Sequence, residues 1–173
     1  MRTRQLMRKH MFHAGFVVLT LAVTLLFLHF RSFGQANSSD PIFGKWMMDQ
    51  TKSVNNRAGD HRTYPTPHVR ILAPEPNGLR NTLSNSPTLP PSYSYSGTFD
   101  GKDHADTRTP GKDQTLAHWR LAPDFIVRLQ KTDGKPSEWV IYTVSSDGKT
   151  FTSVSWVPSN PELQDIEVFT RAN

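Results

Sequence analysis

The sequence predicts an all-β fold, an antiparallel up-and-down β-barrel of about 8–10 strands. Short segments with alternating apolar and polar residues recur beyond residue 40, and none shows the 3.6-residue period of a helix. Asp-Gly-Lys occurs at 100–102, 133–135 and 147–149, and Asp-Gly favours hairpin turns because Gly tolerates a positive φ. All 13 Pro residues also lie beyond residue 40, which indicates many turns and short elements.

Residues 1–36 have the three-part plan of a secretory signal peptide. The basic residues are concentrated in 1–13, Ala14 to Leu28 form an apolar run, and small residues stand at the −3 and −1 positions of a cut after Ala36. We therefore expect a secreted or periplasmic protein whose barrel domain spans 37–173. In the alternative, residues 12–30 stay as an uncleaved anchor, which would be the only contact with a membrane.

Composition narrows the classes of partner. Five of the 20 basic residues and none of the 15 acidic residues lie in 1–36, so the remaining chain is formally neutral. A neutral body without a basic cluster argues against nucleic acid or an anionic membrane surface. The absence of Cys excludes thiolate chemistry, disulfides and cysteine-based zinc sites. We expect one domain and a monomer.

The first strand is predicted at Ile42 to Asp49, around a Gly-x-Trp motif. Gly44 would let neighbouring backbone come close, and Trp46 would supply a large apolar plug. Residues 50–67 are polar and rich in turn residues, so we expect a long loop over one barrel mouth. Further strands are predicted at 68–73, 79–84, 93–99, 115–121, 125–131, 138–145, 150–157 and 163–171.

Two of these strands have an informative pattern. Residues 93–99 place Tyr93, Tyr95, Gly97 and Phe99 on one face and hydroxyl-bearing residues on the other. Residues 138–145 are apolar on both faces, so their outer face is expected to be covered by the long loop or by a partner.

Several motifs together resemble the small secreted bacterial proteins with a lipocalin-like (calycin) domain. They are Gly44-Lys-Trp46 with Asp49 to Ser53, the hairpins at 93–102 and 146–153, and the closing Glu167-Val-Phe-Thr-Arg171. The resemblance implies a barrel with an internal cavity, in a class that usually binds small apolar or amphipathic molecules. It also implies that Trp46 packs against Arg171 and closes the barrel base.

Six residues are candidates for ligand binding: Trp46, Tyr93, Tyr95, His118, Arg120 and Arg171. His118 and Arg120 share a face and could meet an anionic head group in the cavity; they could equally face solvent, or His118 could be hydrogen-bonded in the wall. Tyr93 and Tyr95 could orient a ligand or pack in the core. Arg171 could hold a carboxylate instead of sealing Trp46.

Arg128 alternates with the apolar Phe125, Val127 and Leu129, and this pattern predicts that it faces out.

The sequence shows no catalytic constellation. It lacks a Gly-x-Ser-x-Gly elbow, a phosphate-binding loop and His-Glu-x-x-His. Residues 100–106 contain four potential metal ligands: Asp100, Asp103, His104 and Asp106. Their close spacing on one hairpin tip favours a solvated turn. We expect no metal and no cofactor.

The leading hypothesis is a binding protein for a small hydrophobic or amphipathic ligand. The second hypothesis is an interaction module with a filled barrel. The third is an enzyme that uses His118.

Overall fold

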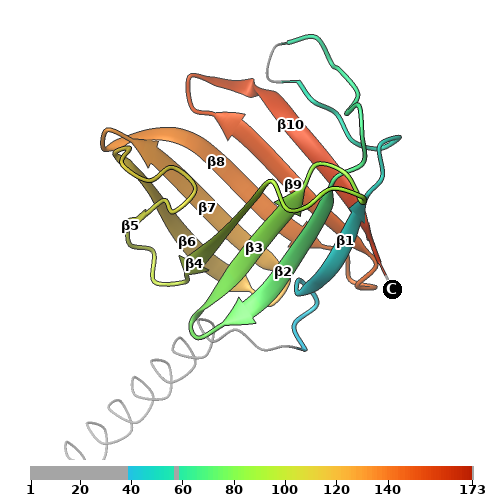
Figure 1. Ribbon diagram of the computed structural model, residues 1–173, viewed down its shortest axis with the longest axis horizontal. Helices are drawn as coiled ribbons and strands as arrows, with labels where there is room; N and C mark the ends of the chain where they lie inside the picture. Colours follow the sequence, from blue (N-terminus) through green and yellow to red (C-terminus); the bar gives the residue numbers. More distant parts are fainter. Residues whose placement is uncertain (1–38, 57–58, 173) are drawn as a thin grey trace, which may run out of the picture. The chain divides into compact units, whose positions relative to one another are not determined.

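The computed structural model describes residues 39–56 and 59–172, and this part of the chain is an antiparallel β-barrel that is nearly closed (Figure 1). The all-β prediction is confirmed. No helix in the described residues is long and apolar enough to cross a membrane. The predicted signal peptide and its membrane-anchor alternative lie outside the described residues. The ten strands are β1 Gly44–Met48, β2 Val69–Glu75, β3 Gly78–Ser84, β4 Tyr93–Thr98, β5 His104–Ala105, β6 Gln114–Ala122, β7 Phe125–Thr132, β8 Lys135–Val144, β9 Thr150–Val157 and β10 Asn160–Arg171.

The strands form one sheet in the order β4-β3-β2-β1-β10-β9-β8-β7-β6-β5. Most neighbours in this order are consecutive in the chain. The exception is the pair of β1 and β10, the first and last strands of the chain, which lie side by side. The two ends of the sheet come together where β4 contacts β6. β4 and β6 are not neighbours in the hydrogen-bonded order, and His118 of β6 packs against Gly97 and Tyr95 of β4 at this seam.

Turn chemistry explains why the hairpins form where they do. Asp133 and Gly134 both have positive φ, 51° and 72°, as a type I′ turn requires. The turn after β2 is tighter than predicted, because β2 continues through Pro74 to Glu75 and pairs to the end of β3. Asn77 has a φ of 55° in this turn, a conformation that Asn tolerates better than most residues.

The barrel base is closed by the predicted contact between Trp46 and Arg171. These residues are directly opposite each other on β1 and β10, and the guanidinium carbon lies 4.1 Å from the centre of the indole. Arg171 also donates hydrogen bonds to the carbonyl oxygens of Phe43 and Gly148, each at 3.0 Å. Gly44 makes room for this guanidinium, not for backbone as predicted: a Cβ on Gly44 would lie 2.6 Å from Nη1 of Arg171.

The apolar core fills the part of the barrel next to this base. Trp46, Phe151 and Phe169 are fully buried, and the ring centres of Phe151 lie 5.4 Å from Trp46 and 5.3 Å from Phe169. Aliphatic side chains complete the cluster, including Ile42, Leu72, Leu79 and Ile126. Burial of these groups supplies the main favourable free energy of folding.

Candidate functional site

The inward-facing residues change from apolar to polar along the strands. On β10, Phe169 lies in the core, whereas Glu167 and Asp165 follow at alternate positions on the same face. On β9, Phe151 is likewise followed by Ser153. The polar positions surround a cavity of about 340 Å³, a volume within the range of small-molecule sites.

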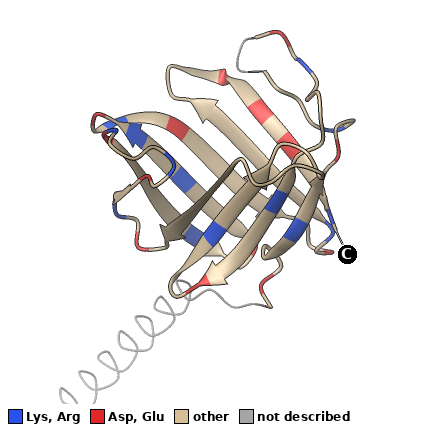
Figure 2. Cartoon of the chain, in the orientation of Figure 1, with Lys and Arg blue, Asp and Glu red and all other residues tan. Residues whose placement is uncertain are grey.

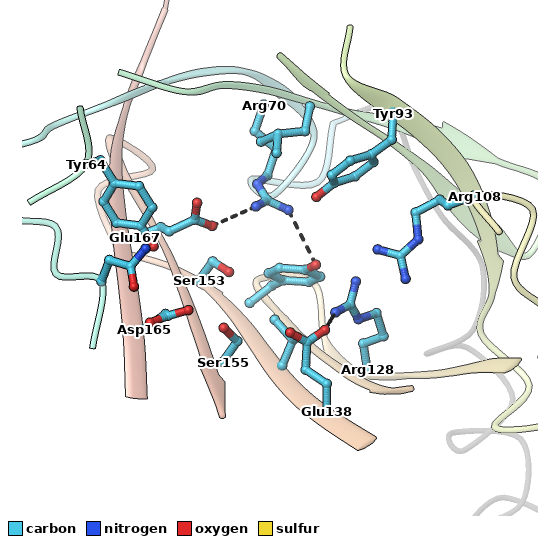
Figure 3. Close-up of a pocket in the computed structure, with 14 residues that line it drawn as sticks. Tyr64, Arg70, Tyr93, Arg108, Arg128, Glu138, Ser153, Ser155, Asp165 and Glu167 are labelled. Atoms are coloured by element: carbon cyan, nitrogen blue, oxygen red, sulfur yellow. Dashed lines mark hydrogen bonds and ion pairs between the residues drawn. The ribbon is translucent and has the colours of Figure 1, made fainter. Parts of the chain in front are cut away.

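The residues of the cavity wall come from many parts of the chain, from Asn55 to Glu167 (Figure 3). The loop before β2 pairs with β10 through Val54 and Ile166, and it contributes Asn55 and Tyr64 to the wall. The predicted long loop therefore does border one end of the barrel interior. Figure 2 shows basic positions on β2 and β7 and acidic positions along β10. The lining residues are Asn55, Tyr64, Arg70, Leu83, Tyr93, Arg108, Arg128, Glu138, Val140, Tyr142, Ser153, Ser155, Asp165 and Glu167.

Arg70 and Glu167 form a buried ion pair in this wall. Nη2 of Arg70 donates to Oε2 of Glu167 at 2.7 Å, and Nδ1 of His68 lies 2.9 Å from the other carboxylate oxygen. Burial alone would raise the pKa of Glu167, but the charge of Arg70 and the bond to His68 bring it below its ordinary value. Glu167 is therefore ionised at neutral pH.

Arg128 lies at the centre of a second network. It pairs with Glu138, and its Nη1 donates to the Tyr95 hydroxyl at 3.2 Å. Asn81 donates to the same hydroxyl at 3.0 Å, and the Tyr142 hydroxyl lies 3.3 Å from it. Burial opposes the charge of Arg128, yet the neighbouring tyrosines and Glu138 raise its pKa well above the ordinary value. The guanidinium is thus a permanent charge inside the barrel.

Arg108 enters the cavity from the segment between β5 and β6. Its guanidinium lies 5.4 Å from the ring centre of Tyr93 and 4.8 Å from that of Tyr95. It also donates to both carboxylate oxygens of Asp106 and, at 2.8 Å, to Oε1 of Gln130. These contacts hold the cation at the seam between β4 and the rest of the barrel.

A second, more open cavity of about 450 Å³ adjoins the first. Arg108 and Glu138 line both cavities, so they form the partition between them. The other residues around the second cavity are all polar: Asp106, Thr109, Gln114, Gln130, Thr132 and Ser137.

Several polar groups of the first cavity lack a protein partner. Nε of Arg70 and Nε of Arg128 are buried without a hydrogen bond. The hydroxyls of Tyr93 and Ser153 line the cavity and make no hydrogen bond within the described part of the chain. Buried polar groups of this kind are normally satisfied by water or by a ligand.

The six predicted ligand-binding residues are spread over three places. Tyr93 lines the cavity, and Tyr95 stands just behind it in the Arg128 network. Trp46 and Arg171 lie at the closed base. His118 and Arg120 lie on β6, outside the lining of either cavity.

Arg120 makes its contacts at the apolar end of the barrel. It forms an ion pair with Asp40 and lies 6.0 Å from the ring centre of Phe99. Here it ties the start of the described chain to β6.

His118 is fully buried in the seam against Gly97 and Tyr95. Its ring centre lies 5.8 Å from that of Tyr95, and a Cβ on Gly97 would come within 2.5 Å of its ring. Both ring nitrogens are without a hydrogen bond. Burial, reinforced by the charges of Arg128 and Arg108, lowers the pKa of His118 to about 3, so the ring is neutral at physiological pH.

The prediction that Arg128 faces out is wrong. It is buried and points inward, whereas its neighbours Val127 and Leu129 stand on the other face of β7. The outer face is also apolar here: Val127 lies beside Trp119 on β6 and Ile141 on β8. Alternation identifies two faces but does not say which one is inside.

The acidic hairpin cluster does not converge on one point. His104 is hydrogen-bonded to Asp100, Asp103 pairs with Lys131, and Asp106 pairs with Arg108. No group of three potential metal ligands is found among the described residues.

Comparisons with known proteins support the fold. No protein-family model matches the chain, and no curated protein sequence matches it. Among solved structures, the fold is similar to a Schistosoma mansoni fatty acid binding protein in complex with arachidonic acid, with a TM-score of 0.59 and 13% identity over 79% of this chain and 100% of that one. It is also similar to two secretory abundant heat soluble proteins of Ramazzottius varieornatus, with TM-scores of 0.58 and 0.57 at 8% and 11% identity, over 78% of this chain and 97% of each. At such low identity these likenesses show the β-barrel fold and nothing finer.

Proposed function

We propose that this chain is an exported binding protein whose barrel takes one small amphipathic molecule and performs no chemistry on it. The observation that carries the proposal is the cavity of about 340 Å³ with Arg70, Arg128 and Tyr93 in its wall. The fatty acid binding protein of similar fold, in complex with arachidonic acid, supports the use of such an interior for a ligand. Export rests on the sequence of residues 1–36.

Binding would combine two contributions. Apolar parts of the ligand would pack against Leu83, Val140 and the ring of Tyr93, at about 0.8 kcal/mol for each buried methylene. Polar parts would form hydrogen bonds with the hydroxyls of Tyr93 and Ser153, which line the cavity and have no partner within the described residues. The small number of aliphatic side chains in the wall favours an amphipathic ligand over a purely hydrophobic one.

Native mass spectrometry of the protein purified from its source tests the binding role. We expect a co-purified small molecule, and we expect its loss in Ser155→Trp, which places an indole in the cavity. Thr152→Trp, one pleat away on the outer face of β9, is the matched control and should retain the ligand. A folded wild-type protein with no bound molecule, and no response to a panel of amphipathic probes, would contradict the proposal.

The export part is tested separately. Sequencing the N-terminus of the protein from the extracellular or periplasmic fraction should find Asn37 as the first residue. A chain that begins at Met1 would contradict cleavage.

An interaction role is the second candidate, favoured by the outer face of β6 to β9. Trp119 and Trp139 stack there with ring centres 6.2 Å apart, and both are only partly buried. A partner protein that covers this face should be lost in Trp139→Ser, measured by affinity capture. Retention of the same partner by the variant would remove this candidate.

A further inference from the structure

We infer that the ligand is polyhydroxylated, a sugar or sugar derivative, and that it extends across both cavities. This inference rests on the proposed function, because it names the chemical class of the molecule that the barrel would bind. It is carried by the balance of charges in the wall, by the hydrogen-bonding groups left open there and by the partition between the two cavities.

The charges of the first cavity cancel. Three arginines and three carboxylates line it among the described residues, the carboxylates being Glu138, Asp165 and Glu167. Glu138 and Glu167 are already paired with Arg128 and Arg70. A fatty acid carboxylate would bring a further negative charge into this balanced wall, close to three like charges.

A hydroxyl group suits such a wall better than a carboxylate does. Hydroxyls both donate and accept hydrogen bonds, so one group can accept from a guanidinium and donate to its carboxylate partner. A sugar offers several hydroxyls without a net charge. Arg70 with Glu167, and Arg128 with Glu138, are therefore complementary to vicinal hydroxyls.

Figure 3 shows that the polar groups surround the space instead of clustering at one end. Tyr93 and Arg108 stand on the side opposite Glu167 and Asp165. The partnerless hydroxyls of Tyr93 and Ser153 come from β4 and β9, so a ligand must present polar groups in more than one direction to reach both.

The wall has few apolar side chains against which an alkyl chain could pack. Leu83 and Val140 are its only aliphatic residues within the described part of the chain. A long chain would remove water from charged groups without replacing their hydrogen bonds, which is unfavourable. The rings of Tyr64 and Tyr93, by contrast, can pack against the C–H faces of a sugar.

The second cavity extends the same chemistry. Arg108 and Glu138 border both spaces, and every other residue around the second cavity has a hydrogen-bonding side chain. The two cavities have volumes of about 340 and 450 Å³. A disaccharide would place one ring on each side of the partition.

Ligand-observed NMR with a fixed panel tests the class. The panel contains glucose, N-acetylglucosamine, maltose, cellobiose, chitobiose, laurate and oleate. We expect saturable binding of at least one sugar, and about three- to tenfold weaker binding of that sugar in Tyr93→Phe and in Ser153→Ala, since each removes one ligand hydrogen bond. Thr152→Ala, on the outer face of β9, should bind as the wild type does.

Ser137→Trp tests the extension across the partition. Ser137 lines the second cavity, so the indole should weaken disaccharide binding at least tenfold and leave monosaccharide binding unchanged. An equal effect on both would overturn the extension.

The remaining outcomes separate the inference from the proposed function. Binding of laurate or oleate with no sugar bound would overturn the sugar class and leave the binding function intact. If no probe binds and native mass spectrometry finds no co-purified molecule, both the inference and the proposed function fail.

Discussion

The two ends of the barrel interior differ although the same strands build them. Near the base, Phe151 and Phe169 pack with Trp46 in a dry aromatic cluster. One pleat repeat further, Ser153 and Glu167 line a polar cavity. Strand pairing therefore fixes the scaffold, whereas the choice of inward residue decides whether a level of the barrel is packed or left open.

Tyr142 marks the boundary between these ends. Its ring centre lies 5.7 Å from that of Phe151, while its hydroxyl lies 3.3 Å from the Tyr95 hydroxyl in the polar network. If the ends have separate roles, substitutions near the base should lower the free energy of unfolding, whereas substitutions near the cavity should weaken ligand binding.

The largest effect is expected for Phe151→Ala in the apolar end. The free energy of unfolding should fall by about 3–5 kcal/mol, because the residue is fully buried and its removal leaves a cavity in the aromatic cluster. Urea denaturation measures this change. Phe125→Ala, at a partly buried position of β7, is the matched control and should cost clearly less. Equal losses at the two positions would contradict a special stabilising role for the apolar end.

The next effect is on the pH dependence of stability, through His118 in the seam. The folded pKa of about 3 lies below the ordinary value of 6.5, so the unfolded chain binds the proton more readily. Stability should therefore fall as the pH drops from about 6.5 toward 3, with up to a tenfold change in the unfolding equilibrium per pH unit.

Urea denaturation of His118→Leu at pH 7 and pH 5 checks this account. The variant should lose much of the difference between the two pH values, because leucine does not titrate. An unchanged pH dependence in His118→Leu would show that the ring is not the titrating group.

Tyr142→Phe should have an intermediate effect on stability. The substitution keeps the ring in the core but removes a hydroxyl that contacts Tyr95, Arg70 and Asn81. We expect a loss of about 1–2 kcal/mol in the free energy of unfolding, since these buried groups lose a partner. A neutral result in denaturation would mean that water replaces the hydroxyl.

Tyr93→Phe should have the smallest effect on stability, below about 0.5 kcal/mol, because its hydroxyl has no partner in the described chain. The same variant is expected to bind ligand less tightly. Thermal unfolding and ligand titration of one preparation measure both quantities. A large loss of stability would place Tyr93 with the packed end of the barrel.

Much of the fold could be predicted because its signals are local. Alternation located every described strand except β5, and Asp-Gly marked turns such as the one at Asp133 and Gly134. The contact of Trp46 with Arg171 came from the resemblance to lipocalin-like proteins, since residues so far apart in sequence give no local signal.

An internal cavity was expected from the resemblance, but Tyr93 was the only candidate that lines it, and Arg128 was predicted to face out. Arg128, Glu138, Ser153 and Glu167 point inward, and on β7 the apolar neighbours of Arg128 point outward. A usable signal lay in the last strand: Glu167 shares a face with Phe169, and a large aromatic residue opposite the first strand belongs to the core. Aligning the other strands on that face would have brought the remaining polar residues together.

A crystal structure of the protein with the small molecule that co-purifies with it would show whether the polar cavity is the binding site. The account predicts ligand density in the polar cavity, within hydrogen-bonding distance of Arg70, Tyr93 and Ser153. Density lodged among Trp46, Phe151 and Phe169, or a barrel filled throughout by its own side chains, would contradict it.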